Sequence, residues 1–335
     1  MAARYGVLGR SRAEHATLPA SLYRLPYALP GNPTKDMSLE DPVVITCSIS
    51  GAIANRVQCP AIPYTPAEYA AEARRIVDEG GVHVHIHARK PDGTPSYEIE
   101  DFQAITDAIR AEVADAAIIN YSTGTIGVPV AKRIEYLRAC RPEVAALNMG
   151  SMNYAKYSKS RKQFVFNMVF ENPFGEIIEL LEAMNELSIK PEHECFDVGH
   201  VGSLAPLIDM GVLRQPLHVD CVMGVIGGIP PSARNLAAMV DNIPEGGGEG
   251  VANHWGVIGI SRDQWMLVSA ALTLGGSIRV GLEDNLYLPS GEMAKSNGEL
   301  IAKARQMTED IGRRPASVEE ARAMLAIPQR DGSAT

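Results

Sequence analysis

Short apolar runs alternate with helix-type stretches along this chain, and this alternation constrains the fold more than any other feature. The eight apolar runs cover residues 43–48, 82–87, 117–122, 144–149, 193–198, 217–223, 254–259 and 277–282. Helical patterns lie at 66–79, 101–114, 129–139, 173–187, 201–211, 231–241, 262–274 and 296–311. Because alternating strands and helices build parallel sheets, eight such units predict a closed (β/α)8 barrel, the TIM-barrel fold.

Helix start signals support this prediction. Thr65-Pro66-Ala67-Glu68 has the pattern of a capping box with proline at the first helical position, and residues 296–299 and 317–320 repeat the box. The alternative fold is a doubly wound open sheet, which would need a glycine-rich dinucleotide turn after an early strand. No G-x-G-x-x-G pattern occurs there, so the barrel is favoured.

The same pattern sets the expected domain boundaries. Residues 1–41 are rich in proline, glycine and mixed polar residues without a helix or strand period. They are expected to form an N-terminal arm, either wrapped around a neighbouring subunit or partly disordered. The catalytic barrel is predicted over residues 42–327, and residues 328–335 are expected to be a C-terminal tail.

Composition narrows the cellular setting. No apolar run approaches the roughly 18 residues of a membrane span, and the N-terminal residues lack the apolar region of a signal peptide. The five cysteines show no C-x-x-C spacing, and their odd number argues against a disulfide framework. A net charge of −9 without a basic block argues against a nucleic-acid partner. We therefore expect a cytoplasmic protein with reduced thiols and small-molecule partners.

The second apolar run, V-H-V-H-I-H, carries three histidines at alternate positions. Alternate residues of a strand share one face, so His83, His85 and His87 lie on the same side, with neighbours roughly 6.6 Å apart. Two imidazoles at this spacing can bind one divalent metal ion. For any single histidine, the alternative is a hydrogen-bonded core residue.

The last run, S-I-R-V-G-L-E-D-N, places Arg279 inside an apolar strand that ends in two carboxylates. A buried arginine needs a partner, and Asp284 is one candidate. Glu283 is then free to join two histidines as an oxygen ligand, which gives the open donor set of a catalytic zinc site. The alternative for Glu283 and Asp284 is a solvated turn.

Other polar side chains also follow predicted strands, where the active site of a barrel lies. These are Ser122, Thr123 and Gly124 after the third strand, Asn148 in the fourth and Glu194 in the fifth. Glu194 is a candidate base, a group that orients a ligand, or one half of a buried ion pair. Gly227 and Gly228 lie in a glycine-rich turn whose backbone N–H groups could hold a phosphate or thioester group.

Five motifs in order make the chain similar to a known family. They are H-I-H-A-R-K-P-D-G-T-P-S from His85, S-T-G from Ser122, L-N-M-G-S-M-N from Leu147, G-V-I-G-G from Gly224 and R-V-G-L-E-D-N from Arg279. From Pro42 to Ile327 the chain resembles the β-keto acid cleavage enzymes. The resemblance implies a zinc-dependent barrel enzyme that condenses a β-keto acid with acetyl-CoA and releases acetoacetate and a new acyl-CoA. It also implies a homo-oligomer, with a tetramer expected.

The resemblance assigns roles to residues of this chain. It implies metal ligands at His85, His87 and Glu283, a catalytic carboxylate at Asp284 aligned by Arg279, a further carboxylate at Glu194 and a substrate-contacting serine at Ser122. The physical logic agrees, because zinc can stabilise an enolate of a 1,3-dicarbonyl compound while a carboxylate removes the proton. Thr123, Gly124 and Asn148 are expected beside the substrate, and Gly227 and Gly228 beside CoA.

Two departures from the family pattern bear on the substrate. Where the lysine-fermenting member carries a glutamate for the substrate's ammonium group, this chain has Ile53, and Ala146 replaces a threonine near Asn148. An ammonium group left unpaired beside Ile53 would cost about 1–3 kcal/mol or more. A neutral or apolar 3-oxo acid is therefore predicted.

Two other functions are compatible with the same residues. A metal-dependent hydrolase on this barrel would also use two histidines and a carboxylate, and His218 and His254 could add to its site, although the resemblance implies that they are core or subunit contacts. A non-catalytic metal-binding barrel is the other alternative, but it leaves Arg279, Asp284 and Glu194 as costly buried charges without a role.

Overall fold

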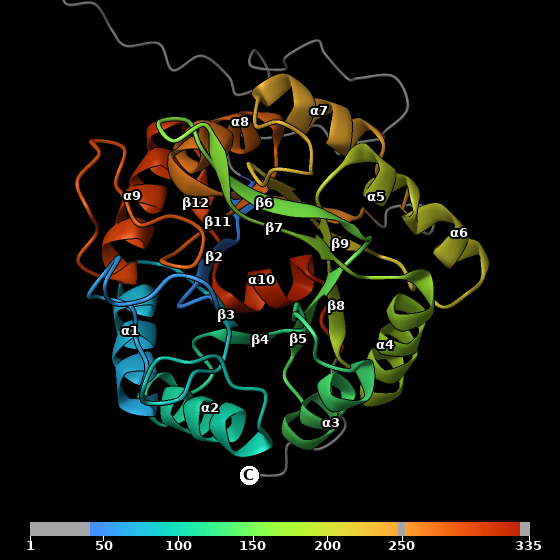
Figure 1. The fold of residues 1–335 in the computed structure, drawn as a ribbon, viewed down its shortest axis with the longest axis horizontal. Helices are drawn as coiled ribbons and strands as arrows, with labels where there is room; N and C mark the ends of the chain where they lie inside the picture. The colour runs from blue at the N-terminus through green and yellow to red at the C-terminus, as the bar shows by residue number, and fades with distance from the viewer. Residues whose placement is uncertain (1–40, 247–251, 329–335) are drawn as a thin grey trace, which may run out of the picture.

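A computed structural model describes residues 41–246 and 252–328 and shows a closed barrel of parallel strands (Figure 1). Around the barrel the strands are β2 (Ile45–Ser48), β3 (His83–Ile86), β4 (Ile118–Ser122), β5 (Val144–Asn148), β8 (Lys190–Cys195), β9 (His218–Met223), β10 (His254–Gly259) and β11 (Ser277–Val280). Pairing of β11 with β2 closes the ring. The predicted TIM barrel is confirmed.

Helices form the outer ring around these strands (Figure 1). They are α1 (Pro66–Asp78), α2 (Ile99–Val113), α3 (Val130–Cys140), α4 (Phe174–Leu187), α5 (Val198–Gly202), α6 (Leu204–Asp209), α7 (Ala233–Asp241), α8 (Gln264–Leu274) and α9 (Asn297–Asp310). None of the helices in the described residues has the length and apolarity that a membrane span requires. Apart from Asp41 and Pro328, the predicted arm and tail lie outside the described residues.

One end of the barrel is closed by α10 (Val318–Met324). The apolar side chains of this segment pack with Val44, Val82, Ile118 and Val144, which lie at or just before the first residues of neighbouring strands. A short parallel pair, β1 (Pro42–Val43) with β12 (Arg314–Pro315), leads into the helix. The amino ends of these strands are therefore covered, and access to the interior is left to the carboxyl ends.

The helix start signals behave largely as predicted. Complete capping boxes begin α1 at Thr65 and α10 at Ser317. At α9 only half of the box forms, because the Glu299 carboxylate accepts a hydrogen bond from the backbone N–H of Lys295 rather than that of Ser296. Each signal still fixes where its helix starts.

The fifth barrel strand and its helix differ from the prediction. The strand covers Lys190–Cys195 instead of 193–198, because β5 supplies partners for Lys190, Pro191 and Glu192, which are poor strand formers in isolation. The predicted helix over 201–211 is two short helices, α5 and α6, that meet at Ser203. Pro206 explains the break, because it lacks an N–H group and its ring excludes a preceding helical turn.

An antiparallel hairpin that the sequence analysis left as a connection joins β5 to α4. Its strands are β6 (Met152–Ser158) and β7 (Gln163–Phe170). Met152, Tyr154 and Phe170 pack with apolar residues at the ends of β8, β9 and β10, namely Phe196, Val222, Val225, Ile258 and Ile260. The hairpin therefore lies over the carboxyl end of the barrel, where Figure 1 shows it crossing the ring of strands.

Candidate active site

His85, His87 and Glu283 converge at the carboxyl end of the barrel. The Glu283 carboxylate lies 3.1 Å from His87 Nε2 through Oε1 and 3.7 Å from His85 Nε2 through Oε2. One donor atom from each residue lies within 4.8 Å of the other two. Strands β3 and β11 both neighbour β2, which explains how residues almost 200 positions apart meet.

The state of these groups suits a divalent cation. Burial, followed by the charge of Arg279, lowers the pKa of His85 well below its ordinary value, so its imidazole is neutral and its lone pair is available. Burial alone would raise the pKa of Glu283, but the charges of His87 and Arg279 outweigh it and hold the carboxyl ionised. Glu283 Oε2 is buried without a hydrogen-bond partner among the described residues. Two imidazoles and one ionised carboxylate form a fitting zinc donor set.

Arg279 joins several carboxylates into one buried network. Its Nε and Nη2 donate to the two Asp284 oxygens at 2.9 and 3.2 Å, which confirms the predicted pairing. Its Nη1 donates to Glu194 at 3.0 Å, and Nη2 also donates to Glu283 at 3.1 Å. One guanidinium therefore positions both the candidate catalytic carboxylate and a candidate metal ligand.

Asp284 has a second donor that the sequence analysis missed. The Ser48 hydroxyl donates to Asp284 Oδ2 at 2.5 Å. This contact depends on Gly281, since a Cβ there would lie 2.1 Å from the Ser48 carbonyl oxygen. Burial raises the pKa of Asp284, and the charge of Arg279 opposes that shift. Such a carboxyl, held by two partners and made more basic by burial, is suited to proton abstraction.

Glu194 accepts a hydrogen bond from Nη1 of Arg279. Burial raises its pKa to about 8, although the charge of Arg279 opposes the shift. Of the three roles considered from the sequence, the structure shows the buried ion pair with an arginine. Its position in β8 places it in register with Asn148 of β5, so the two side chains belong to adjacent strands of the same rim. Its role in proton transfer stays a prediction.

The predicted substrate residues lie close together, except for Ile53. A Cβ on Gly124 would lie 2.9 Å from Asn148 Nδ2 and 3.5 Å from Ser122 Oγ, so these three residues border one space. Thr123 is buried and donates its hydroxyl to the Ala146 carbonyl at 2.5 Å, which indicates a positioning role for it. Ile53 is 58% exposed and lies two residues beyond Gly51, which packs against Glu283.

Gly227 and Gly228 pack against the hairpin and β8. A Cβ on Gly227 would meet the Asn153 carbonyl oxygen at 1.6 Å, and one on Gly228 would meet the Phe196 carbonyl oxygen at 2.5 Å. These close contacts explain why both positions lack a side chain. The predicted contact with CoA stays a prediction.

Tyr154 of the hairpin also belongs to this site. Burial raises its pKa to about 12, and the negative charges of Glu283, Asp284 and Glu194 add to the shift. Its ring stacks on Phe166 at a centroid distance of 5.9 Å. The sequence offered no signal for it, because its proximity to the carboxylates depends on a hairpin that the alternating pattern does not predict.

A second polar cluster fills the barrel interior. Glu192, His218 and Asp220 are buried, and one donor atom from each lies within 4.8 Å of the other two. Burial raises the pKa of Glu192 and of Asp220, which favours a shared proton between the two carboxyls. His218 is therefore a core residue beside His254, at a ring distance of 5.3 Å, and neither histidine joins the His85 triad.

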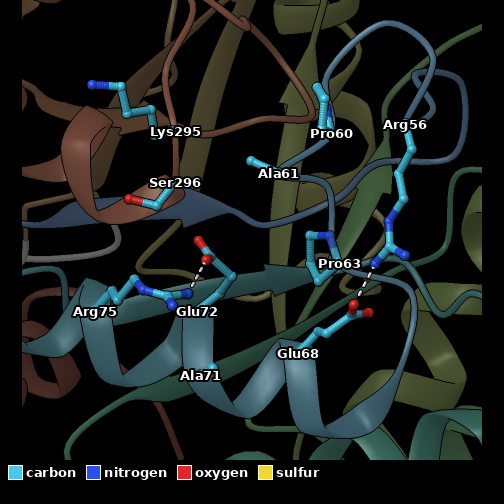
Figure 2. A pocket seen from close by; sticks show the side chains of 10 residues that line it. All are labelled: Arg56, Pro60, Ala61, Pro63, Glu68, Ala71, Glu72, Arg75, Lys295 and Ser296. Carbon is cyan, nitrogen blue, oxygen red and sulfur yellow. Dashed lines mark hydrogen bonds and ion pairs between the residues drawn. The ribbon is translucent and has the colours of Figure 1, made fainter.

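A surface cavity of about 540 Å³ lies between the 56–63 loop, α1 and the start of α9 (Figure 2). Two of its three cations pair within it, Arg56 with Glu68 at 2.6 Å and Arg75 with Glu72. None of the sequence-predicted site residues lines this cavity. Both of its arginines are paired, and the candidate metal ligands lie at the barrel rim instead.

These features define a TIM-barrel protein with a candidate metal centre of two histidines and one carboxylate, next to a carboxylate held by arginine. The chain belongs to the β-keto acid cleavage enzyme family, whose model matches residues 42–327.

Individual relatives agree with this membership. The chain is 33% identical over 285 residues to the 3-keto-5-aminohexanoate cleavage enzyme of Fusobacterium nucleatum subsp. nucleatum, covering 85% of this chain and 98% of the relative. It is 34% identical over 308 residues to the 3,5-dioxohexanoate:acetyl-CoA acetone transferase of Paraburkholderia graminis, covering 87% and 97%. The solved apo structure of ObcA superposes with a TM-score of 0.66 at 19% identity, covering 80% of this chain and 66% of that one, which supports the fold.

Proposed function

We propose that this protein is a zinc-dependent β-keto acid cleavage enzyme that converts a neutral or apolar 3-oxo acid and acetyl-CoA into acetoacetate and a new acyl-CoA. The observation that carries the proposal is the placement of Asp284, held by Arg279 and Ser48, directly beside the His85, His87 and Glu283 donor set. Family membership and relatives named as acetyl-CoA transferases support the reaction class.

Each residue of the site has a separate role in the proposed reaction. His85, His87 and Glu283 would hold the metal, which when bound supplies Lewis acidity for the 1,3-dicarbonyl oxygens. Arg279 and Ser48 orient the Asp284 carboxylate, which takes the proton between the two carbonyl groups of the 3-oxo acid. Ser122 and Asn148 border the space beside Gly124 and offer hydrogen bonds to the substrate carboxylate. Tyr154 lies on the hairpin over the carboxyl end of the barrel, within electrostatic reach of Glu283 and Asp284.

Carbon–carbon cleavage then follows in two exchanges. The C2 carbanion attacks the acetyl thioester carbonyl, a C–C bond forms, and CoA leaves as the thiolate. The thiolate adds to the C3 ketone, and the bond between C2 and C3 breaks with its electron pair on C2. Protonation of C2, by the proton that Asp284 took, gives acetoacetate, while the original acyl group departs as the new acyl-CoA. No redox step occurs.

The loop after the first barrel strand bears on the choice of substrate. Ile53 offers no acceptor to an ammonium group, which disfavours an amino-substituted substrate. The relative named for 3,5-dioxohexanoate, a substrate without an amino group, is 34% identical to this chain, which is compatible with a neutral 3-oxo acid. The oligomer predicted from the resemblance remains part of this proposal.

A panel of 3-oxo acids, assayed with and without acetyl-CoA, tests the proposal. We expect acetoacetate only when acetyl-CoA is present, and higher kcat/KM for neutral 3-oxo acids than for 3-keto-5-aminohexanoate. Ile53→Glu should shift the preference toward the amino substrate by about tenfold, which one new charge-assisted hydrogen bond would provide. Cleavage without CoA would favour the hydrolase alternative, and a zinc-loaded protein inactive on the whole panel would favour the non-catalytic barrel.

Zinc affinity gives a second test. Glu283→Gln removes the anionic ligand but keeps the side-chain shape, and we expect zinc affinity to fall about 100-fold or more. Competition with a chromogenic chelator measures the change. Glu192→Gln is the matched control, because it alters a buried carboxyl in the neighbouring cluster and should leave zinc affinity within about threefold. Equal loss in both variants would contradict the assignment of the metal site.

A further inference from the structure

The tip of the β6–β7 hairpin gathers four cations in an otherwise acidic protein. Lys156, Lys159, Arg161 and Lys162 lie within seven positions, and all four side chains are exposed. None of them forms an ion pair with another of the described residues. The sequence analysis found no basic block, because Tyr157, Ser158 and Ser160 interrupt this short run of cations. A concentration of unpaired cations favours an anionic ligand.

The root of the same hairpin lies at the active site. The charges of Glu283, Asp284 and Glu194 act on Tyr154, which shows that this side chain lies within electrostatic reach of the catalytic carboxylates. Tyr154 and Lys156 are two residues apart on one strand, so they share a face. The strand that carries Tyr154 therefore leads from the neighbourhood of the carboxylates toward the cationic tip.

The length of the hairpin fits an extended ligand. From Met152 to Ser158 the strand advances about 20 Å at roughly 3.3 Å per residue. The extended pantetheine arm of CoA is of the same order, and it separates the thioester from the phosphates and the adenine. A thioester held beside Asp284 would therefore place its phosphates near Lys159, Arg161 and Lys162.

Two aromatic rings stand exposed at the same end of the hairpin. Tyr157 and Phe164 pair across the strands at a centroid distance of 5.5 Å, and they remain 42% and 52% exposed. Exposed rings next to cations suit a ligand with a flat heteroaromatic group and phosphates, because stacking and charge act together.

We propose that the hairpin is the recognition element for the nucleotide part of acetyl-CoA, with Lys159, Arg161 and Lys162 binding its phosphates and Tyr157 and Phe164 contacting its adenine. The inference rests on the proposed function, since it names where that function's co-substrate binds. It moves the principal phosphate contacts to the hairpin tip from the Gly227–Gly228 turn, which lies against the backbone of Asn153 and Phe196.

Neutralising the tip tests this proposal. We expect the combined Lys159→Gln, Arg161→Gln and Lys162→Gln variant to weaken CoA binding about tenfold or more by calorimetry, because it loses charge-assisted contacts to phosphates. The KM for acetyl-CoA should rise by a similar factor with kcat nearly unchanged. With S-acetylpantetheine, a thioester that lacks the nucleotide, wild type and variant should have the same KM.

The matched control removes three cations elsewhere. This combined variant carries Arg74→Gln on α1, Arg138→Gln on α3 and Lys303→Gln on α9, and it changes the net charge by the same amount. The proposal would be overturned if the hairpin variant kept its CoA affinity, or if the hairpin and control variants lost the same affinity. It would also be overturned if the KM for S-acetylpantetheine rose as much as the KM for acetyl-CoA. CoA binding without turnover of any 3-oxo acid would instead contradict only the proposed function.

Discussion

Asp284→Asn is expected to lower kcat by about 10³-fold while zinc content stays the same, because positioned proton transfer contributes on this order. The amide keeps the shape of the carboxyl and one oxygen for the Arg279 and Ser48 donors, but it cannot accept the C2 proton. Steady-state kinetics with a neutral 3-oxo acid and acetyl-CoA measure the loss. Deuterium exchange at C2 without acetyl-CoA isolates the proton-transfer step, and it should fall in parallel.

Ser48→Ala is the control for that substitution. It removes the hydroxyl that donates to Asp284 at 2.5 Å but leaves the carboxylate and its bidentate arginine in place. We expect a loss of about tenfold, since only one of the groups that orient Asp284 is gone. If Asp284→Asn kept kcat within tenfold of wild type while Glu194→Gln lost more, the base would be Glu194 instead.

The candidate metal ligands and Arg279 could be predicted from the sequence because each depends on local pattern. Period-two alternation places His85 and His87 on one face, and an arginine in an apolar strand requires a carboxylate close by. The barrel itself follows from the alternating pattern. The position of a residue at the end of its strand then indicates that it belongs to the rim.

What the sequence could not predict depends on how strands far apart in the chain are aligned. Arg279 contacts Glu194 and lies 4.0 Å from Glu192 because closing the barrel brings side chains of β8 and β11 together, and no spacing along the chain encodes that distance. Ser48 is a small polar residue at a strand end, without charge or motif to draw attention. The hairpin lies outside the eight strand–helix units, so their alternation does not predict it, although Gln163–Phe170 is rich in Phe and Val.

Arg279→Met is expected to lower the free energy of unfolding by about 3–5 kcal/mol near pH 8, which is typical when one partner of a buried ion pair is removed. Methionine fills similar volume but leaves Asp284, Glu194 and Glu283 without their shared cation. Chemical denaturation of wild type and variant with a chelator present measures the difference, so that metal binding does not add to it.

The loss of stability in Arg279→Met should depend on pH and should grow as the pH rises. Glu194 has a folded-state pKa of about 8, above its unfolded value, so its contribution to stability is complete below the unfolded pKa and is lost as pH rises through 8. Arg279 opposes this upward shift, as it does for Asp284. Without the arginine both carboxyls bind protons more tightly, and the gap between wild type and variant should widen from pH 6 to pH 9.

Arg133→Met is the matched control, because Arg133 is equally buried but pairs with Glu176, whose side chain is partly exposed and can be solvated. Its loss should be smaller and nearly independent of pH over the same range. The double variant Arg279→Met with Asp284→Asn should recover part of the stability, since one of the stranded charges is then gone. A pH-independent loss in Arg279→Met, or no recovery in the double variant, would mean that packing rather than charge explains the role of Arg279.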